Sequence, residues 1–526
     1  MQRREFLAAV AAASCRMAAS EEQQSDIRRG RGSVAGETVA SPEQGYADPE
    51  QGLWRRLFLD ATVVEESAGL ARVFHQASKF SANPIIKRDR PWEAGTAVAG
   101  PYVYGTVLED GGRYRLWYQL IMDGQHVGYA ESRDGLEWRK PNLGLLRGQT
   151  DRKNNLVVSD WDKSATGGSC HNPSVVCCPW EQDPARRYRL YGFDYSSGPR
   201  LAFSPDGLRW RYSEDAAARP LFRSSDVVNV FRDSLRSRFA ATWKAQSRRG
   251  RSVGVAVSDD GIHWSKPVDG PVFIADDLDP DATQVYGMPV FPYQGLYIGL
   301  AWMYRARYVK VGRYSPAAML AAQASSPRTV DVELAWSWDL VNWTRTPDRK
   351  PFIPRGDPGD FDAAMIYTAR APIRVQDELW FYYGGCLKAH DEPRDEAAIG
   401  LARLRLDGFC SMRAHDREGM LVSRTEALSV PAVTINARTH GDGFVVAELL
   451  DSRNRVVPGF GRDQCKPFTG DSVQHVLRWD RDRFPATMQR QPVRLRFFLR
   501  NADLYAYAPQ EVWEQDFDVT PATAGP

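Results

Sequence analysis

Residues 256–264 read AVSDDGIHW, and variants of this nine-residue phrase return along the 526-residue chain. The other copies read AESRDGLEW at 130–138, AFSPDGLRW at 202–210 and AWSWDLVNW at 335–343, with a decayed copy, ARLRLDGF, at 402–409. Successive copies lie roughly 50 to 80 residues apart, which is the spacing of propeller blades joined by variable loops. The five copies therefore predict five blades.

An aromatic-rich strand and a hairpin precede each copy of the phrase. YRLWY at 114–118 lies upstream of the first copy, and LWFYY at 379–383 lies upstream of the last. Aromatic and apolar runs of this length, bounded by turn residues, are typical of β-strands. The chain is therefore predicted to be all-β, with a five-bladed β-propeller over residues 52–409.

The repeated phrase has the chemistry of a tight turn. In the pattern SxDGxxW, the Ser and Asp side chains bond backbone amides of the turn, and Gly permits a positive φ. We expect the Trp side chain to pack back between blades. These residues are predicted to be structural, and we nominate none of them for catalysis.

The repeat stops near residue 409, and a different β pattern follows. FVVAELL at 444–450 and VRLRFFL at 493–499 are predicted strands, the second of which alternates between apolar and basic residues. Short turns between such strands predict a β-sandwich over residues 410–515, which we expect to pack against the propeller. Residues 516–526 are predicted to be a C-terminal tail.

Composition and charge narrow the classes of function. Hydrophobic residues make up 43% of the chain, and Lys plus Arg (68) nearly balance Asp plus Glu (66), giving a net charge of +2. A near-neutral protein has no strong field to attract a polyanion, so we predict no nucleic-acid partner. The 16 Trp, 21 Tyr and 22 Phe residues suit both a β-rich core and a surface that stacks on sugars.

The first 20 residues, MQRREFLAAVAAASCRMAAS, resemble a twin-arginine export signal, and 21–51 is predicted to be a flexible linker. We therefore predict export to the periplasm or the extracellular space. No segment reaches the roughly 18 apolar residues of a membrane span. A lipid anchor at Cys15 stays open because AASC resembles a lipobox, and so does a chance Arg-Arg pair before an ordinary helix. The other six cysteines lack zinc-like spacing and are predicted to be buried free thiols.

The repeats also point to a family. The stretch SWDLVNW at 337–343 closely resembles the blade turn of glycoside hydrolase families 32 and 43, and a propeller followed by a β-sandwich is similar to the family 32 layout. The resemblance implies hydrolysis of a glycosidic bond in an oligo- or polysaccharide. The chain departs from family 32 by lacking Trp-x-Asn-Asp-Pro-Asn, Arg-Asp-Pro and Glu-Cys in the first three blades, so no catalytic residue carries over by motif.

Glycoside hydrolysis needs two carboxyl groups, one protonated donor and one ionised base or nucleophile. In a propeller the innermost strands begin around one mouth of the axis, so residues just before each first strand converge there. The catalytic candidates are Glu93, Asp226, Asp281 and Asp362, and the substrate-binding candidates are Trp92, His171, Tyr286 and His390. Structural roles for the loop carboxylates and the two histidines stay open as alternatives.

Two other functions stay open at this point. A non-catalytic carbohydrate-binding propeller would keep the aromatic residues without pairing the carboxyl groups. A glycoside phosphorylase would need Arg, Lys or His at the mouth to hold phosphate, for which Arg88, Arg90 and His171 are candidates. No cofactor is expected and no metal ligand is nominated, although the alternating acids of residues 277–281 leave calcium possible.

Overall fold

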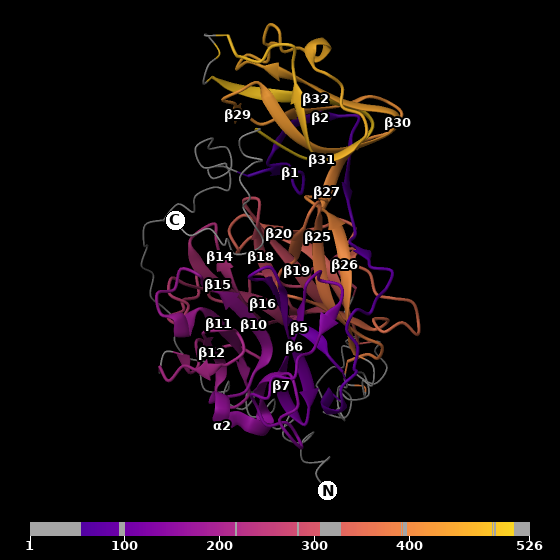
Figure 1. The fold of residues 1–526 in the computed structure, drawn as a ribbon. Coiled ribbons are helices and arrows are strands. Elements are labelled where there is room, and N and C mark those ends of the chain that lie inside the picture. The colour runs from indigo at the N-terminus through magenta and orange to yellow at the C-terminus, as the bar shows by residue number, and fades with distance from the viewer. Residues whose placement is uncertain are drawn as a thin grey trace, which may run out of the picture. The chain divides into compact units, whose positions relative to one another are not determined.

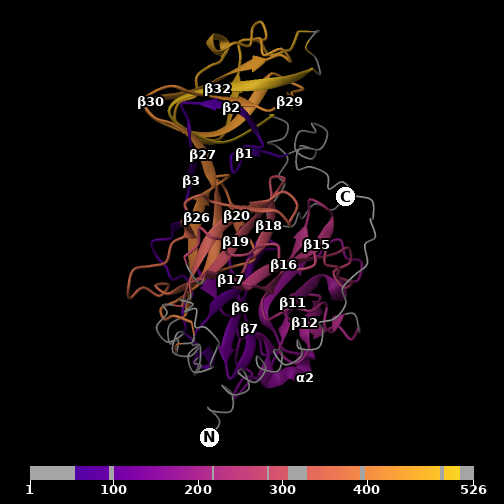
Figure 2. The same cartoon turned by 180° about the vertical axis from the view of Figure 1, so that it is seen from behind.

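The computed structural model describes residues 54–93, 100–215, 218–280, 283–305, 328–390, 392, 397–485, 488 and 491–509. These residues form an almost entirely β structure, which confirms the all-β part of the predicted fold class (Figures 1 and 2). The helical elements are single turns: η2 (Pro91–Glu93), η3 (Asp160–Asp162), α2 (Lys163–Thr166), η4 (Pro184–Arg186) and η6 (Arg462–Gln464).

The first three repeats each form a separate antiparallel sheet. The first comprises β5 (Tyr102–Glu109), β6 (Tyr114–Met122), β7 (Gly124–Ser132), β8 (Trp138–Arg139) and β9 (Leu156–Ser159). The second comprises β10 (His171–Cys177), β11 (Tyr188–Asp194), β12 (Gly198–Ser204) and β13 (Arg211–Tyr212). The third comprises β14 (Val228–Asp233), β15 (Arg238–Ser247) and β16 (Gly250–Ser258).

The last two repeats share an eleven-stranded sheet, joined by one parallel pairing of Val330 with Met365. The fourth repeat supplies β17 (Thr283–Gly287), β18 (Val290–Tyr293), β19 (Leu296–Arg305), β20 (Thr329–Ser337), β21 (Trp343–Arg345) and β22 (Pro351–Ile353). The fifth supplies β23 (Met365–Thr368), β24 (Ile373–Val375), β25 (Glu378–Cys386) and β26 (Ala398–Arg405). At its edge, β26 pairs with β4 (Ser78–Lys79), from the start of the described chain.

The C-terminal strands form a nine-stranded sheet that also recruits the start of the described chain. Its strands after residue 409 are β27 (Cys410–Ala414), β28 (Gly419–Ser423), β29 (Glu426–Ala427), β30 (Ala432–Leu450), β31 (Asp471–Arg478) and β32 (Pro492–Pro509). The early strands are β1 (Arg56–Leu57), β2 (Val64–Ala68) and β3 (Ala71–Phe74), which pair with β32, β28 and β27. The predicted boundaries at 52 and 410, and the β-sandwich, stay predictions.

The repeated turn forms as predicted. Ser258 Oγ accepts a hydrogen bond from Gly261 N at 2.8 Å, and Asp260 Oδ1 accepts one from Ile262 N at 2.8 Å. Trp264 Nε1 donates to Gly261 O at 3.2 Å, and Gly261 has a φ of 76°. The same Ser and Asp bonds recur in the copies that begin at residues 130, 202 and 335.

Buried aromatic side chains tie these turns to neighbouring sheets. Each donates to the carbonyl of a turn glycine: Trp117 to Gly207 at 2.7 Å, Tyr191 to Gly261 at 3.2 Å and Tyr382 to Gly135 at 3.0 Å. The last of these bonds joins the fifth repeat to the first. Inner strands follow the same order, since β5 contacts β10, β10 contacts β14, β14 contacts β18, and β23 contacts β5. No single sheet of the described residues closes on itself, and the five-bladed propeller stays a prediction.

The turn glycines have no room for a side chain. A Cβ on Gly261 would lie 2.4 Å from Tyr191 Oη and 2.7 Å from Arg189 Nη1, whereas a Cβ on Gly111, with a φ of 62°, meets nothing within 4 Å. Replacing either glycine with Ala costs about 1–2 kcal/mol for the left-handed backbone. We expect Gly261→Ala to lose about 1–3 kcal/mol more, because it overpacks the sheet interface. Chemical denaturation measures both losses, and equal losses would refute the packing account.

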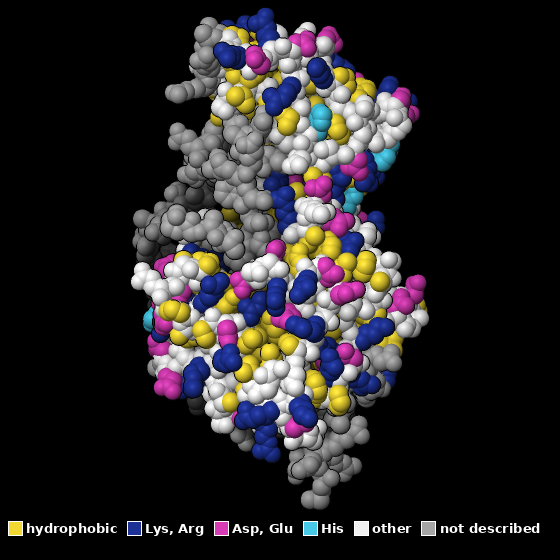
Figure 3. All heavy atoms as spheres, in the orientation of Figure 1, with side chains coloured by type: hydrophobic (Ala, Val, Ile, Leu, Met, Phe, Trp, Pro, Cys, Tyr) yellow, Lys and Arg dark blue, Asp and Glu magenta, His cyan; other side chains and the backbone are white. Residues whose placement is uncertain are grey.

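The surface and the cysteines agree with a compact β fold. Cys170, Cys177, Cys178, Cys410 and Cys465 are buried free thiols, as predicted, and Cys386 is buried. On the face in Figure 3, Lys and Arg side chains are interspersed with Asp, Glu and apolar side chains. Within the described residues, no helix has the length and apolarity needed to cross a bilayer.

Candidate functional site

Asp226 carries an ionised carboxylate at the start of the third repeat. It precedes β14, and its Oδ1 accepts hydrogen bonds from Lys244 Nζ at 2.7 Å and from Ser225 Oγ at 3.1 Å. Tyr195 Oη donates to Oδ2 at 3.4 Å. Burial raises the pKa of Asp226, but Lys244 and His171 outweigh it and hold the pKa far below its usual range. The side chain keeps 27% of its surface exposed, so a ligand can reach it.

Tyr286 lies beside the same lysine. Lys244 Nζ is 3.9 Å from the centroid of the Tyr286 ring, and Arg251 Cζ is 5.7 Å from it. The phenol oxygen lies 3.1 Å from His390 Nε2. Burial raises the pKa of Tyr286, but Lys244, His390 and Arg251 outweigh it and lower the pKa to about 7. The phenol therefore exchanges its proton near neutral pH, which few tyrosines do.

His171 and a group of aromatic rings complete the site. The His171 Nδ1 lies 2.9 Å from Gln125 Oε1, and burial lowers the pKa of His171 to about 4, so the imidazole is neutral at pH 7. Its ring meets the Tyr104 ring edge-on at 5.2 Å and the Tyr195 ring at 5.6 Å. Tyr195 is 59% exposed, which is unusual for so large a side chain beside buried rings.

The site draws on all five repeats, and five of its members lie on or just before a first strand. Tyr104 belongs to β5, His171 to β10 and Tyr286 to β17, while Asp226 precedes β14. Tyr367 of β23 contacts the Tyr104 ring at 5.0 Å and the Tyr286 ring at 5.7 Å. We call this group the Tyr286 site, made of Tyr104, His171, Tyr195, Asp226, Lys244, Tyr286, Tyr367 and His390.

Four of the eight candidate residues from the sequence therefore meet in one place: His171, Asp226, Tyr286 and His390. Sequence reasoning overlooked Lys244, although it is the single basic residue of the apolar run FAATWKA at 239–245. A charge in such a run, on a strand buried on both sides, points to a buried partner. Tyr104, Tyr195 and Tyr367 offered no comparable signal, because tyrosines are also common in β cores.

Glu93 and Trp92 lie in a different environment. Glu93 is fully buried, and its carboxylate accepts hydrogen bonds from Tyr118 Oη at 3.1 Å and Lys140 Nζ at 2.8 Å. Trp92 Nε1 donates to Asn155 Oδ1 at 2.9 Å. These partners belong to the first sheet and its loops, and none is a member of the Tyr286 site.

Asp362 is likewise held by its own partners. Its Oδ2 lies 2.6 Å from Lys79 Nζ and accepts a hydrogen bond from Tyr383 Oη at 2.8 Å. The carboxylate thereby fastens the fifth repeat to β4, and its contacts do not include the Tyr286 site. Asp281, the remaining catalytic candidate, lies outside the described residues.

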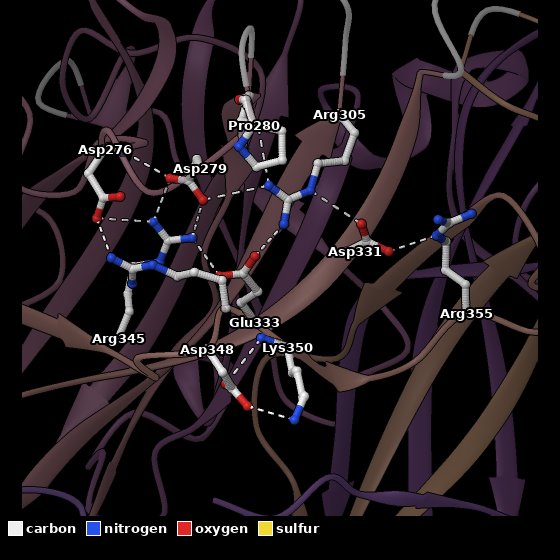
Figure 4. A network of polar contacts seen from close by, with 12 residues as sticks. Asp276, Asp279, Pro280, Arg305, Asp331, Glu333, Arg345, Asp348, Lys350 and Arg355 are labelled. Carbon is white, nitrogen blue, oxygen red and sulfur yellow. Dashed lines mark hydrogen bonds and ion pairs between the residues drawn. The ribbon is translucent and has the colours of Figure 1, made fainter.

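A second group of charges lies in the fourth repeat (Figure 4). Arg345 donates to both oxygens of Asp279, at 2.6 and 2.7 Å, and to Glu333 at 2.5 Å. Arg305 pairs with Glu333 and, at 3.3 Å, with Asp331. The side chains of Asp279 and Glu333 are fully buried. Burial raises the pKa of Glu333, and Arg345 opposes that rise. Each carboxylate already holds a guanidinium, so this network acts as a structural clamp.

The clamp includes Asp279 of the acidic segment 277–281, whose alternating acids leave calcium possible. Asp279 is occupied by Arg345, and Asp277 pairs with Arg249, so a cation there would have to displace an arginine. Across the described parts of the chain, no group of three or more His, Cys, Asp or Glu residues is placed to hold a metal ion. The expectation of no cofactor, with calcium left possible, stays a prediction.

Comparison with known proteins gives similarity in structure only. No family model matches the sequence, and no curated protein matches it. A glycosyl hydrolase from Bacteroides ovatus covers 63% of this chain and 94% of its own, with a TM-score of 0.44 and 14% identity.

Two further solved structures have similar scores. One, from a study of the GH130 family of mannoside phosphorylases, which contains glycoside hydrolases that target β-1,2 mannosidic linkages in Candida mannan, covers 63% of this chain and 94% of its own (TM-score 0.43, 14% identity). The match to a thermostable family-43 glycoside hydrolase covers 60% of this chain and 93% of that enzyme (TM-score 0.37, 15% identity). Similarity this low does not transfer an activity, so the function has to follow from the side chains of the Tyr286 site.

Proposed function

We propose that this protein is an exported glycoside hydrolase that cleaves its substrate in the Tyr286 site, at the mouth of a five-bladed β-propeller. One observation carries the proposal: an ionised, solvent-accessible carboxylate, Asp226, lies among aromatic side chains near the starts of five repeats. Aromatic rings bind the apolar faces of sugars, and glycoside cleavage needs such a carboxylate. Export rests on the Arg3-Arg4 signal, which lies outside the described residues.

Asp226 and Tyr286 divide the acid–base work in this proposal. Asp226 is ionised and can therefore take a proton from the attacking water. Because Lys244 holds its pKa low, Asp226 is a weak base, and its contribution rests on its position beside the substrate. The leaving oxygen then needs a proton from another group. Tyr286, whose pKa is lowered to about 7 by Lys244 and its other charged neighbours, is the donor. This division replaces the pair of carboxyl groups expected from the sequence.

Activity is expected to fall as the pH rises through about 7, because Tyr286 must carry its proton to act as the donor. The near-ultraviolet absorbance of tyrosinate measures the ionisation directly. Wild type should gain this absorbance as the pH rises through the same range, and Tyr286→Phe should lose both the early absorbance change and most of the activity. A wild-type activity that stays level up to pH 9 would exclude Tyr286 as the donor.

Tyr195 is expected to serve as a stacking platform for the sugar next to Asp226. The residue is 59% exposed, and its hydroxyl donates a hydrogen bond to the Asp226 carboxylate. Tyr195→Ala should weaken glycan binding roughly tenfold, as loss of a stacked aromatic contact does. Trp180 is the matched control, since it is 50% exposed but is contacted by Arg232 outside the site. Calorimetric titration with a glycan panel tests this, and equal losses for Tyr195→Ala and Trp180→Ala would contradict it.

A non-catalytic sugar-binding protein is the second candidate. It is favoured by the single carboxylate that the described members of the Tyr286 site contain. A hydrolysis screen of wild type on aryl glycosides and polysaccharides separates the two functions. Release of sugar supports the hydrolase, whereas retention on a glycan column without release supports the binding protein. Failure of both would refute the proposed carbohydrate function.

A further inference from the structure

Two basic side chains, those of Lys244 and Arg251, lie on one face of the β15–β16 hairpin. In the antiparallel register, Lys244 lies opposite Val253 and Gln246 lies opposite Arg251. Side chains alternate along a strand, so Lys244 and Arg251 share a face and are diagonal neighbours. Both reach the Tyr286 ring of the next repeat, at 3.9 and 5.7 Å from its centroid.

Lys244 and Arg251 differ in burial and in their carboxylate partners. Lys244 is buried, with 4% of its side chain exposed, and pairs with Asp226 at 2.7 Å. Arg251 is half-buried and, within the described part of the chain, has no carboxylate partner. Its Nη1 donates to Gln284 Oε1 at 3.0 Å, and its Cζ lies 5.2 Å from the centroid of the Tyr304 ring. The Asp226–Lys244 pair is neutral, so among the described residues no carboxylate compensates the charge of Arg251 at the edge of the site.

We propose that Arg251, supported by Lys244, binds an oxyanion in the Tyr286 site. A guanidinium presents a planar fork of donors that matches the two oxygens of a carboxylate or phosphate, and one donor of Arg251 is already fixed by Gln284. Lys244 neutralises Asp226 and thereby removes the charge that would repel an incoming anion. The lowered pKa of Tyr286 agrees with a net positive field at this position.

This inference deepens the proposed function, and it rests on that function where the bound oxyanion belongs to a sugar substrate. The oxyanion is then the carboxylate of an acidic sugar, and the substrate class is a glycan that contains uronic acid. The same chemistry is available from free phosphate, which would act as a co-substrate. In that case a phosphate oxygen bonds to the anomeric carbon as the glycosidic C–O bond breaks, and the leaving oxygen takes the proton that the phosphate hydroxyl gives up.

Calorimetric titration tests the site with defined probes: a panel of uronic-acid oligosaccharides, their carboxyl-reduced counterparts, and inorganic phosphate. Wild type should bind at least one acidic oligosaccharide roughly tenfold more tightly than its reduced counterpart. Arg251→Gln should remove that preference. Arg248→Gln is the matched control, because Arg248 lies exposed at the tip of the same hairpin and its loss changes the net charge equally.

The titration of Tyr286 reports whether the anion sits where proposed. A bound anion beside Lys244 and Arg251 disfavours the phenolate, so the tyrosinate absorbance should appear at a higher pH when the ligand is present. Phosphate binding that Arg251→Gln abolishes, without any preference among the sugars, assigns the oxyanion to free phosphate. The inference is overturned if Arg251→Gln leaves all oxyanion binding intact, if Arg248→Gln weakens it equally, or if no acidic probe or phosphate binds.

The outcomes also separate this inference from the proposed function. Equal binding of acidic and neutral sugars, with hydrolysis intact, would refute the oxyanion site and leave the hydrolase standing. Phosphate binding through Arg251 without binding of any sugar would support the oxyanion site and refute the proposed hydrolase. Arg251→Lys retains the charge but not the planar guanidinium donors, so it should recover part of the affinity. That partial recovery would show that the loss in Arg251→Gln is a loss of binding and not a folding defect.

Discussion

Replacing Asp226 with Asn should lower the rate of glycoside cleavage about 10²–10⁴-fold, the usual effect of losing a general base. The amide keeps the shape of the side chain but cannot take a proton from water. The carboxylate is ionised at neutral pH because Lys244 lies 2.7 Å from it. Initial rates on the best substrate of a glycan screen measure the effect, with calorimetry to show that substrate still binds.

Ser225→Ala is the control for this variant. Ser225 donates one hydrogen bond to Asp226 at 3.1 Å, so its loss leaves the carboxylate and the lysine in place. We expect a change of only a few-fold in rate, because the Lys244 contact at 2.7 Å remains and keeps the carboxylate ionised. A loss below about tenfold in Asp226→Asn would show that Asp226 is not the base.

Arg345→Met should destabilise the protein by about 3–5 kcal/mol, the cost of leaving the buried carboxylate of Asp279 without its bidentate partner. Arg345 binds both Asp279 and Glu333, whose side chains are fully buried (Figure 4). The remaining Arg305 lies 3.6 Å from Asp279 and cannot replace the bidentate contact. Denaturant unfolding monitored by tryptophan fluorescence measures the loss.

Two further variants decide whether uncompensated charge is the cause. Lys350→Met breaks an exposed pair with Asp348 at 3.0 Å and should cost less than about 1 kcal/mol. Adding Asp279→Asn to Arg345→Met removes the stranded charge, while Glu333 keeps its ion pair with Arg305, so the double variant should recover much of the stability. A double variant as unstable as the single one would show that Arg345 acts through packing alone.

Local chemistry explains which parts of the fold could be predicted. The SxDGxxW turn closes through bonds between residues two or three positions apart, such as Gly261 N to Ser258 Oγ, so the sequence contains all of its determinants. The recruitment of β1, β2 and β3 into the C-terminal sheet had no such signal. Their partners are more than 300 residues away, and VEESA at 64–68 carries no apolar alternation.

The same contrast applies to the site. The rule that first strands begin around one mouth placed His171, Asp226 and Tyr286 together, because topology alone brings strand starts to one place. The rule did not tell which carboxylates already have a cation. Glu93 with Lys140 and Asp362 with Lys79 are satisfied by residues distant in the sequence, and no local pattern reveals such pairs. The sequence therefore predicted that His171, Asp226 and Tyr286 lie together, but not which carboxylates are already paired with a cation.

The most direct test compares the rate of glycoside cleavage by Asp226→Asn with that of the double variant Glu93→Gln/Lys140→Met, each per mole of folded protein. The double variant removes the buried Glu93–Lys140 pair as a unit, and the other carboxylate that pairs with Lys140, Asp89, is exposed, so no buried charge is left without a partner. We predict that it keeps activity near that of wild type, while Asp226→Asn loses about 10²–10⁴-fold. The reverse result, an active Asp226→Asn and an inactive double variant, would contradict catalysis in the Tyr286 site.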